Sequence, residues 1–335
     1  MELNFEHRSA AHCENGVTTN LLRYYGYDYS EPLIFGLSGS LFFVNLPFIK
    51  LNGFPGVSFR PVPGAIFSRA MRMLGFKTQS TIFFNKKNAE KKLDSLLEKG
   101  VPTGVVVGMY YLPYMPIEYR FHFNAHNLCV IGKDEEGYIV SDPIATEKVK
   151  LSSDDMLRAR FAKGTLPPMG KLYWIKSLPE KTPDMNLLVR KAIGKNCYRM
   201  LHQPGPVPWV GVNGFRYMAK DIPRFPEKYG LRRAALCLGQ IVRMMEEIGT
   251  GGAGFRFLYA AFLQEAAVIT QIDELNFFSE RMTAIGDLWR EFAVEAARIC
   301  KNRSAENINY QSIGKFFGEI GEKETHFFSD LEKII

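Results

Sequence analysis

The sequence predicts an α+β fold in two parts: a mixed helix-and-sheet domain over residues 1–180 and an all-helical domain over residues 181–335. The first part carries short apolar runs bounded by glycine, proline and asparagine, which is the pattern of strands and hairpins. The second part carries long runs with apolar residues three and four apart, which indicates amphipathic helices. The pattern changes in the proline-containing stretch 178–183, where we place the domain boundary.

The first helix is expected to begin at or just after Cys13. Val17, Leu21 and Leu22 lie at helical spacing, and Gly26 supplies a stop. Backbone N–H groups and the helix dipole favour negative charge at a helix start, so a thiol there can have a lowered pKa. Cys13 is therefore a candidate nucleophile. For a lone cysteine the simpler interpretation is a small buried residue, unless a base and a carboxylate lie nearby.

The rest of the first domain is expected to form a mostly antiparallel sheet with flanking helices. Ser30 caps a second helix, and the glycine-containing stretch 35–43 leads into a strand. Further strands are expected at 57–59, 81–84, 104–111, 125–131, 137–140, 146–150 and 171–176, and further helices at 65–74, 85–99 and 153–162.

The second domain is expected to contain helices alone, because no convincing strand follows residue 180. These helices are expected at 185–201, 212–221, 231–248, 255–270, 273–301 and 310–334. The chain shows no internal repeat and no low-complexity segment.

The composition is that of a globular protein, with 46% hydrophobic and 23% charged residues among 335. The polar N-terminus does not resemble a secretory signal, and no apolar run approaches the roughly 18 residues of a membrane span. Five cysteines without CxxC spacing argue against a disulfide framework or structural zinc. His122 and His126 are four apart but lack a third ligand, so no metal site is expected. We expect a cytoplasmic protein.

The net charge of +7 is unevenly distributed along the chain. Residues 151–250 carry seventeen Lys/Arg and eight Asp/Glu, whereas residues 251–335 carry nine and thirteen. A basic middle favours an acidic partner or an anionic substrate, although a solvated basic surface explains it equally well. No nucleic-acid-binding motif accompanies the charge, so nucleic acid is not expected.

His126 begins one predicted strand, and Asp142 ends the next. In a hairpin the start of one strand lies beside the end of the other, so these side chains can meet at one edge of the sheet. A histidine oriented by a carboxylate and facing a thiol at a helix start is the arrangement that nucleophilic cysteine catalysis requires. The candidate catalytic residues are therefore Cys13, His126 and Asp142.

This order of residues resembles that of papain-like cysteine enzymes, and the spacing of sixteen between His126 and Asp142 resembles their bacteriocin-processing branch. More closely, the stretch 12–43, HCENGVTTNLLRYYGYDYSEPLIFGLSGSLFF, resembles the N-terminal domain of the butirosin biosynthesis protein H family. The stretches 214–224 and 250–256 resemble the second domain of that family.

The resemblance implies an acyltransferase of natural-product assembly. Such an enzyme moves an acyl group from the phosphopantetheine thioester of an acyl carrier protein to an amine or hydroxyl of a small-molecule acceptor. By this resemblance Cys13 takes the acyl group, His126 is base and then acid, and Asp142 orients His126. The protein then has no cofactor of its own, because the donor carrier protein supplies the phosphopantetheine.

One position departs from the papain pattern, which has a glutamine oxyanion donor six residues before the nucleophile. Here that position is His7, for which a structural role is the simpler interpretation. His7, His12 or Asn124 can donate to an oxyanion beside the backbone N–H of Cys13. Gly39 is a further substrate-binding candidate, because glycine allows close backbone approach.

Two other functions remain open on the sequence alone. A peptidase or amidase would use the same triad with water as acceptor. A non-catalytic scaffold would bind an acyl carrier or a partner enzyme, although it has no need to keep all three candidate residues. The sequence leaves the acyl group, the acceptor, a possible homo-oligomer and the role of the helical domain undecided.

Overall fold

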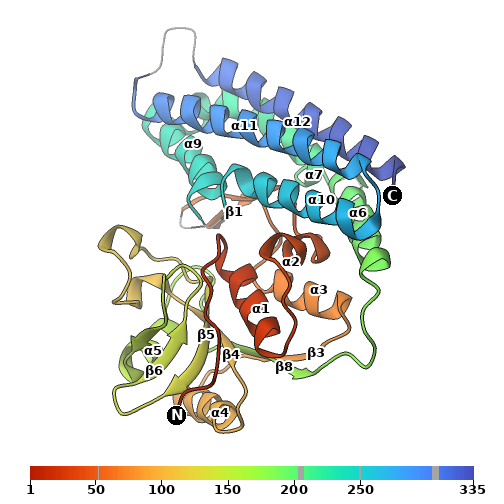
Figure 1. Ribbon diagram of the computed structural model, residues 1–335. Coiled ribbons are helices and arrows are strands. Elements are labelled where there is room, and N and C mark those ends of the chain that lie inside the picture. Colours follow the sequence, from red (N-terminus) through yellow and green to blue (C-terminus); the bar gives the residue numbers. More distant parts are fainter. Residues whose placement is uncertain (52, 203–206, 249, 304–308) are drawn as a thin grey trace. The chain divides into compact units, whose positions relative to one another are not determined.

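The computed structural model describes residues 1–51, 53–202, 207–248, 250–303 and 309–335 (Figure 1). The chain forms two compact units, each with its own dense set of internal contacts. The first unit contains residues 1–34 and 63–183, and the second contains residues 35–62 and 184–335.

The first unit is built on a six-stranded antiparallel sheet in the order β3-β8-β4-β5-β6-β7. The strands are β3 (Lys77–Thr81), β4 (Thr103–Val107), β5 (His126–Lys133), β6 (Tyr138–Ser141), β7 (Val149–Leu151) and β8 (Leu172–Ser177). The helices are α1 (Cys13–Tyr24), α3 (Ala65–Met73), α4 (Lys86–Leu97) and α5 (Ser153–Arg160), with 3₁₀ turns at Met109–Tyr111 and Ile117–Tyr119. Helix α2 (Glu31–Leu37) contains the first boundary between the units.

Side-chain alternation along β4 and β5 gives the sheet two buried faces. One face presents Val105 and Leu128, which belong to an apolar core completed by residues of α4 and α5 such as Leu93 and Met156. Helix α1 packs on β5 and α3 packs on α1. The opposite face carries Tyr173, whose ring lies 4.7 Å from that of Phe67 of α3. Nearly every residue of α1 through Leu22 is buried, which fixes the helix that begins at Cys13.

The α+β class expected from the sequence is confirmed, with two local differences. The strand expected over 104–111 ends at Val107, because a 3₁₀ turn follows Gly108. The strand expected over 81–84 lies instead at Lys77–Thr81. That edge strand is polar and largely exposed, so it carries no apolar alternation by which it could be recognised.

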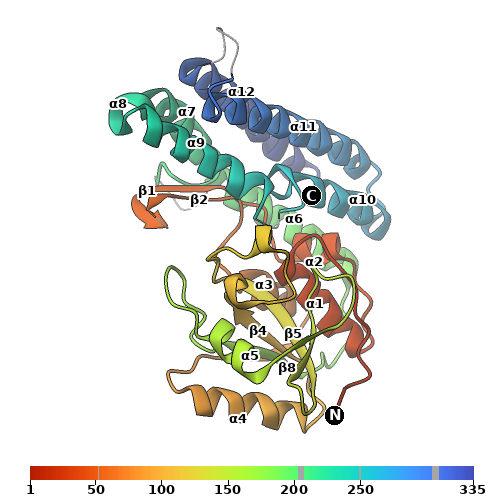
Figure 2. The same cartoon turned by 90° about the vertical axis from the view of Figure 1, so that its left-hand side faces the viewer.

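The second unit contains seven α-helices in its described part, together with 3₁₀ turns at Ile222–Arg224 and Ala253–Phe255 and one β-hairpin. The helices are α6 (Met185–His202), α7 (Gly211–Asp221), α8 (Phe225–Tyr229), α9 (Leu231–Glu246), α10 (Arg256–Thr270), α11 (Glu274–Cys300) and α12 (Tyr310–Lys333). The hairpin is β1 (Val44–Leu51) and β2 (Phe54–Ser58), and the long helices α11 and α12 lie side by side (Figures 1 and 2). Within the described ranges, no helix combines the length and apolar character needed to cross a bilayer.

The structure corrects the expected domain division for residues 35–62, which join the helical unit. The ring of Phe43 stacks on that of Phe215 with centroids 4.4 Å apart, and the ring of Phe59 lies 5.3 Å from that of Phe43. Backbone bonds of 2.8 Å run from Asn45 N–H to the Trp209 carbonyl and from Gly211 N–H to the Phe43 carbonyl. The hairpin therefore completes the helical core, and a division by chain order alone misses it.

A buried ion pair lies at the centre of the second unit. The Arg256 guanidinium donates to both Glu324 oxygens at 2.8 Å, and both side chains are fully buried. Trp289 Nε1 donates to the same carboxylate at 2.6 Å, and Arg256 also donates to the Gly254 carbonyl. The ring of Phe59 lies 5.4 Å from the guanidinium carbon. The charges are thus paired and hydrogen-bonded, as burial requires.

Candidate active site

Helix α1 places Cys13 in its first turn. His12 is the N-cap, and its Nδ1 accepts a hydrogen bond from the Asn15 N–H at 3.3 Å. The Glu31 carboxylate binds the two residues before the cysteine: it accepts hydrogen bonds from the N–H groups of Ala11 at 2.9 Å and His12 at 2.8 Å. Side-chain acceptors therefore bind backbone N–H groups both before and after Cys13, which holds the backbone around the nucleophile.

Glu14, directly after the cysteine, fixes α1 to the next helix. Its fully buried carboxylate accepts from the N–H groups of Gly64, Ile66 and Phe67 at 2.9–3.1 Å. These groups lie at the start of α3, where backbone N–H groups lack partners within the helix. The side chain of Glu14 thus supplies the missing cap of α3 and holds the turn that carries Cys13.

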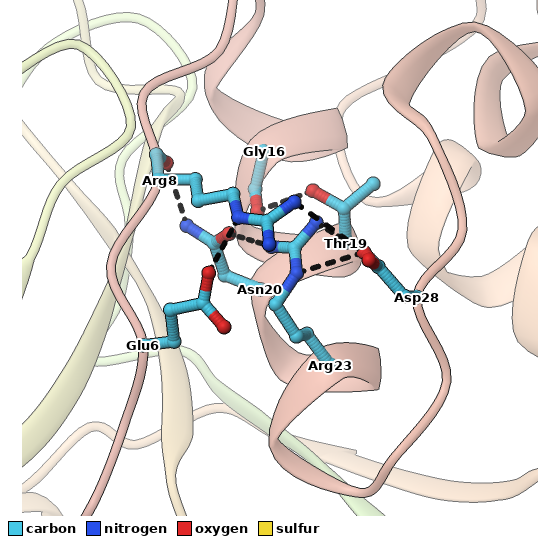
Figure 3. Close-up of polar contacts among 7 residues, drawn as sticks. All are labelled: Glu6, Arg8, Gly16, Thr19, Asn20, Arg23 and Asp28. Atoms are coloured by element: carbon cyan, nitrogen blue, oxygen red, sulfur yellow. Dashed lines mark hydrogen bonds and ion pairs between the residues drawn. The ribbon is translucent and has the colours of Figure 1, made fainter.

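A polar network on the outer side of α1 holds the N-terminal segment against the helix (Figure 3). Asn20 donates to the Arg8 carbonyl at 2.8 Å and accepts from Arg23 at 2.8 Å. Arg23 also pairs with Asp28 at 2.8 Å, and Arg8 pairs with Glu6 at 2.6 Å. The segment that leads to Cys13 is therefore tied to the helix that follows it.

His126 and Asp142 meet at one edge of the sheet. His126 is the first residue of β5 and Asp142 follows the last residue of β6, its neighbouring antiparallel strand. His126 Nε2 donates to Asp142 Oδ2 at 2.8 Å, and both side chains are buried. Asp142 Oδ1 accepts from the Ile144 N–H at 3.1 Å, which holds the carboxylate in place. The hydrogen bond from His126 to Asp142 orients the imidazole ring. It uses Nε2, so Nδ1 is the ring nitrogen that takes no part in this bond.

The pKa of His126 reports its surroundings. Burial alone lowers this pKa, but the charges of Asp142 and of the Cys13 thiolate, together with side-chain hydrogen bonds to both, raise it to about 10. When protonated, His126 interacts with two negative groups, the Cys13 thiolate and the Asp142 carboxylate. A positive charge on His126 therefore stabilises a negative charge on the Cys13 sulfur, and the thiolate is the nucleophilic form of cysteine.

Tyr114 and Asn127 contact this group, and Tyr173 contacts Asn127. The Tyr114 hydroxyl donates to Asp142 Oδ2 at 2.7 Å, and its pKa is raised well above the usual value by burial and by the charge of Asp142. Asn127 Nδ2 lies 3.8 Å from Cys13 Sγ, and Asn127 Oδ1 accepts from the Tyr173 hydroxyl at 2.9 Å. Sequence reasoning missed all three.

The other predicted site residues have different surroundings. His7 Nδ1 lies 2.8 Å from Ser141 Oγ and its Nε2 lies 3.2 Å from the Ala145 carbonyl, so both ring nitrogens contact protein groups. Asn124 Nδ2 donates to the carbonyls of Lys163 and Thr165 at 3.0 Å, which closes a loop. The side chains of His7 and Asn124 therefore have hydrogen-bond partners other than Cys13. The Nδ1 of His12 accepts the bond that caps α1.

Gly39 belongs to the second unit, whereas Cys13, His126 and Asp142 belong to the first. Its φ of +55° lies in the left-handed region, and its carbonyl accepts from Arg199 at 2.7 Å. A Cβ at this position would meet only the end of the flexible Arg199 side chain, at 2.6 Å, so the left-handed backbone rather than packing favours glycine. Among the described residues, no group of three His, Cys, Asp or Glu side chains is arranged to hold a metal ion.

Removing the Tyr114 hydroxyl should raise the pKa of His126. In Tyr114→Phe, Asp142 Oδ2 loses a donor that partly offsets its charge, so the carboxylate stabilises the imidazolium more strongly. We expect an upward shift of about one pH unit, which corresponds to ~1.4 kcal/mol, in an NMR titration of the His126 ring. Tyr119→Phe, at an exposed position, is the matched control and should leave the titration unchanged. An unchanged or lowered pKa in Tyr114→Phe would contradict this account of the carboxylate.

Two family models match the chain. The model described as butirosin biosynthesis protein H, N-terminal, matches residues 12–143, and a domain of unknown function (DUF4872) matches residues 154–331. No curated protein matches the chain. Among solved structures, a protein from Bacillus anthracis described as a C39-like peptidase is 15% identical with a TM-score of 0.38. That match covers 53% of this chain and 99% of the other.

Proposed function

Because the chain belongs to the butirosin biosynthesis protein H-like family, we propose that it is a cysteine-dependent acyltransferase. It takes an acyl group from the phosphopantetheine thioester of an acyl carrier protein and transfers it to an amine of a small-molecule acceptor. A hydroxyl acceptor would need the same machinery. The observation that carries the proposal is the buried His126–Asp142 pair at 2.8 Å, which interacts electrostatically with the Cys13 sulfur at a helix start.

The first half-reaction loads the enzyme. The Cys13 thiolate attacks the thioester carbonyl, a carbon–sulfur bond to Cys13 forms, and the bond to the phosphopantetheine sulfur breaks. The imidazolium of His126 gives its proton to the departing sulfur, so the carrier leaves as a thiol and His126 becomes neutral. One thioester replaces another, so this exchange is nearly balanced in free energy.

The second half-reaction delivers the acyl group. The acceptor amine attacks the Cys13 thioester, and neutral His126 takes the proton that the nitrogen loses. The Cys13 sulfur departs as a thiolate, which restores the original ion pair with the imidazolium. Asp142 holds the ring in the tautomer that both steps need. Asn127 Nδ2, 3.8 Å from the sulfur, donates toward the thiolate in its resting state.

The fate of the acyl group tests transfer against hydrolysis. The protein is loaded with an acyl thioester, freed from excess donor, and mixed with a panel of primary amines or with buffer alone. We expect the acyl-enzyme to persist in buffer and to disappear with amine, yielding one equivalent of amide by mass spectrometry. Rapid release of free acid in buffer, unaffected by amine, would replace the transferase with a hydrolase of the same fold.

A further inference from the structure

Basic residues gather on the helices α7 to α9 of the second unit. Residues 211–246 contain seven Lys/Arg and three Asp/Glu, whereas residues 251–335 of the same unit contain nine and thirteen. The seven are Arg216, Lys220, Arg224, Lys228, Arg232, Arg233 and Arg243. Helices α7 to α9 therefore carry an excess of positive charge, as does α6 with its four Lys/Arg, whereas the later helices carry an excess of negative charge.

Large apolar side chains lie exposed among these charges. Leu231 and Leu236 of α9 are 76% and 53% exposed, and Phe48 of the neighbouring hairpin strand β1 is 61% exposed. Arg232 lies between the two leucines in the sequence and is also exposed. Exposed apolar side chains surrounded by charged ones are typical of a protein–protein interface. In such an interface the apolar residues lie at the centre and the polar residues form the rim.

Two shallow hollows of about 330 and 340 Å³ lie in this region. The first is lined by Tyr229–Arg233 and Leu236, and the second by Pro208, Asn213, Arg216, Tyr217 and Lys220.

Strand β1 contacts α7, and strand β2 of the same hairpin contacts α9. Lys50 Nζ lies 6.0 Å from the centre of the Tyr229 ring at the first hollow. The ring of Phe48 lies 5.0 Å from that of Trp209, which in turn lies 6.3 Å from that of Tyr217 at the second. The hairpin thus neighbours the first hollow through Lys50 and the second through Phe48 and Trp209.

We propose that this surface docks the acyl carrier protein that delivers the thioester, a proposal that rests on the function proposed above. The occupant is recognised by its chemistry: an acidic helix whose carboxylates meet Lys220 and Arg232 and whose apolar side chains cover Leu231 and Leu236. Complementary charge speeds the encounter and sets the register, and the apolar centre supplies contact area. The excess of Lys and Arg in the middle of the chain is then explained by an acidic partner, and not only by a solvated basic surface.

Charge reversal separates docking from chemistry. We compare the wild-type protein with Lys220→Glu/Arg232→Glu, using one acyl group supplied either on a carrier protein or on N-acetylcysteamine, a small thioester without protein. We expect kcat/KM for the carrier substrate to fall 30- to 100-fold in the double variant. The rate with the small thioester should change less than twofold. Increasing salt should slow the wild-type reaction with the carrier and leave the variant almost unaffected.

Lys87→Glu/Lys91→Glu, on the exposed face of α4 in the first unit, is the matched control and should retain the carrier rate. An unchanged carrier rate in the Lys220/Arg232 variant, or an equal loss with both thioesters, would overturn the docking surface. If the wild-type protein reacts with neither thioester, the proposed function itself fails, and that result is distinct from a failure of docking.

Discussion

Replacing His126 with alanine should lower the rate of Cys13 acylation about a thousandfold, because general acid–base catalysis typically contributes 10²–10⁴. The variant loses both the charge that stabilises the thiolate and the proton that the departing sulfur needs. The measurement is a quenched-flow time course of the acyl-enzyme by mass spectrometry. His202→Ala, which replaces an exposed histidine of α6, is the control and should keep the wild-type rate. A loss of less than tenfold in His126→Ala would show that the imidazole takes no part in the transfer.

The same residue predicts how stability depends on pH. The pKa of His126 is about 10 in the folded protein against an ordinary 6.5, so the native state binds the proton more tightly. The resulting stabilisation is fully present below pH 6.5 and is lost as pH rises toward 10. In the wild-type protein the proton that Cys13 releases to form the ion pair offsets this uptake, so the contribution of His126 is measured without the thiol. Between these pH values, urea unfolding of Cys13→Ala, in which Asp142 still raises the pKa of His126, should show a steeper decline than that of Cys13→Ala/His126→Ala. Parallel declines would mean that His126 is not protonated at neutral pH.

Replacing Glu324 with alanine should destabilise the second unit by about 3–5 kcal/mol, because Arg256 then remains buried without a counter-charge. Trp289 Nε1 also loses its acceptor. A loss of this size is a large share of the stability of an ordinary domain. Thermal and urea unfolding measure it, followed by circular dichroism at the helix band.

The exposed pair between Arg216 of α7 and Glu322 of α12 provides a matched comparison, because Glu322 lies on the same helix as Glu324. Both side chains are about half exposed, at 47% and 50%, and their closest approach is 2.9 Å. Glu322→Ala should cost no more than about 1 kcal/mol, since water screens the pair. Equal effects in Glu322→Ala and Glu324→Ala would contradict the role assigned to the buried pair.

Local patterns predict the elements that carry the site. The helix that begins near Cys13 follows from its apolar spacing, and the hairpin between His126 and Asp142 follows from two apolar strands and a polar turn. Hairpin geometry is local, so it already brings His126 and Asp142 to one edge of the sheet. The structure adds the proximity of Cys13, which depends on how α1 packs on β5.

Contacts between distant segments explain what the sequence did not predict. Tyr173 reaches Asn127 only because β8 inserts next to β4 in the sheet order, and strand order is not visible in local periodicity. Tyr114 reaches Asp142 from a loop without a repeating pattern. The segment 35–62 joins the helices through aromatic packing, whereas division by chain order assumes that each domain is continuous.

The central claim is that Cys13 forms a covalent acyl-enzyme, and intact-protein mass spectrometry after mixing with acylated carrier protein tests it most directly. The chain has five cysteines, so the adduct is assigned by comparing Cys13→Ala with Cys300→Ser, which replaces a partly exposed cysteine of α11. The account predicts a gain of one acyl group in the wild-type protein and in Cys300→Ser, and none in Cys13→Ala. No adduct across a broad set of thioesters, or an adduct that persists in Cys13→Ala, would contradict it.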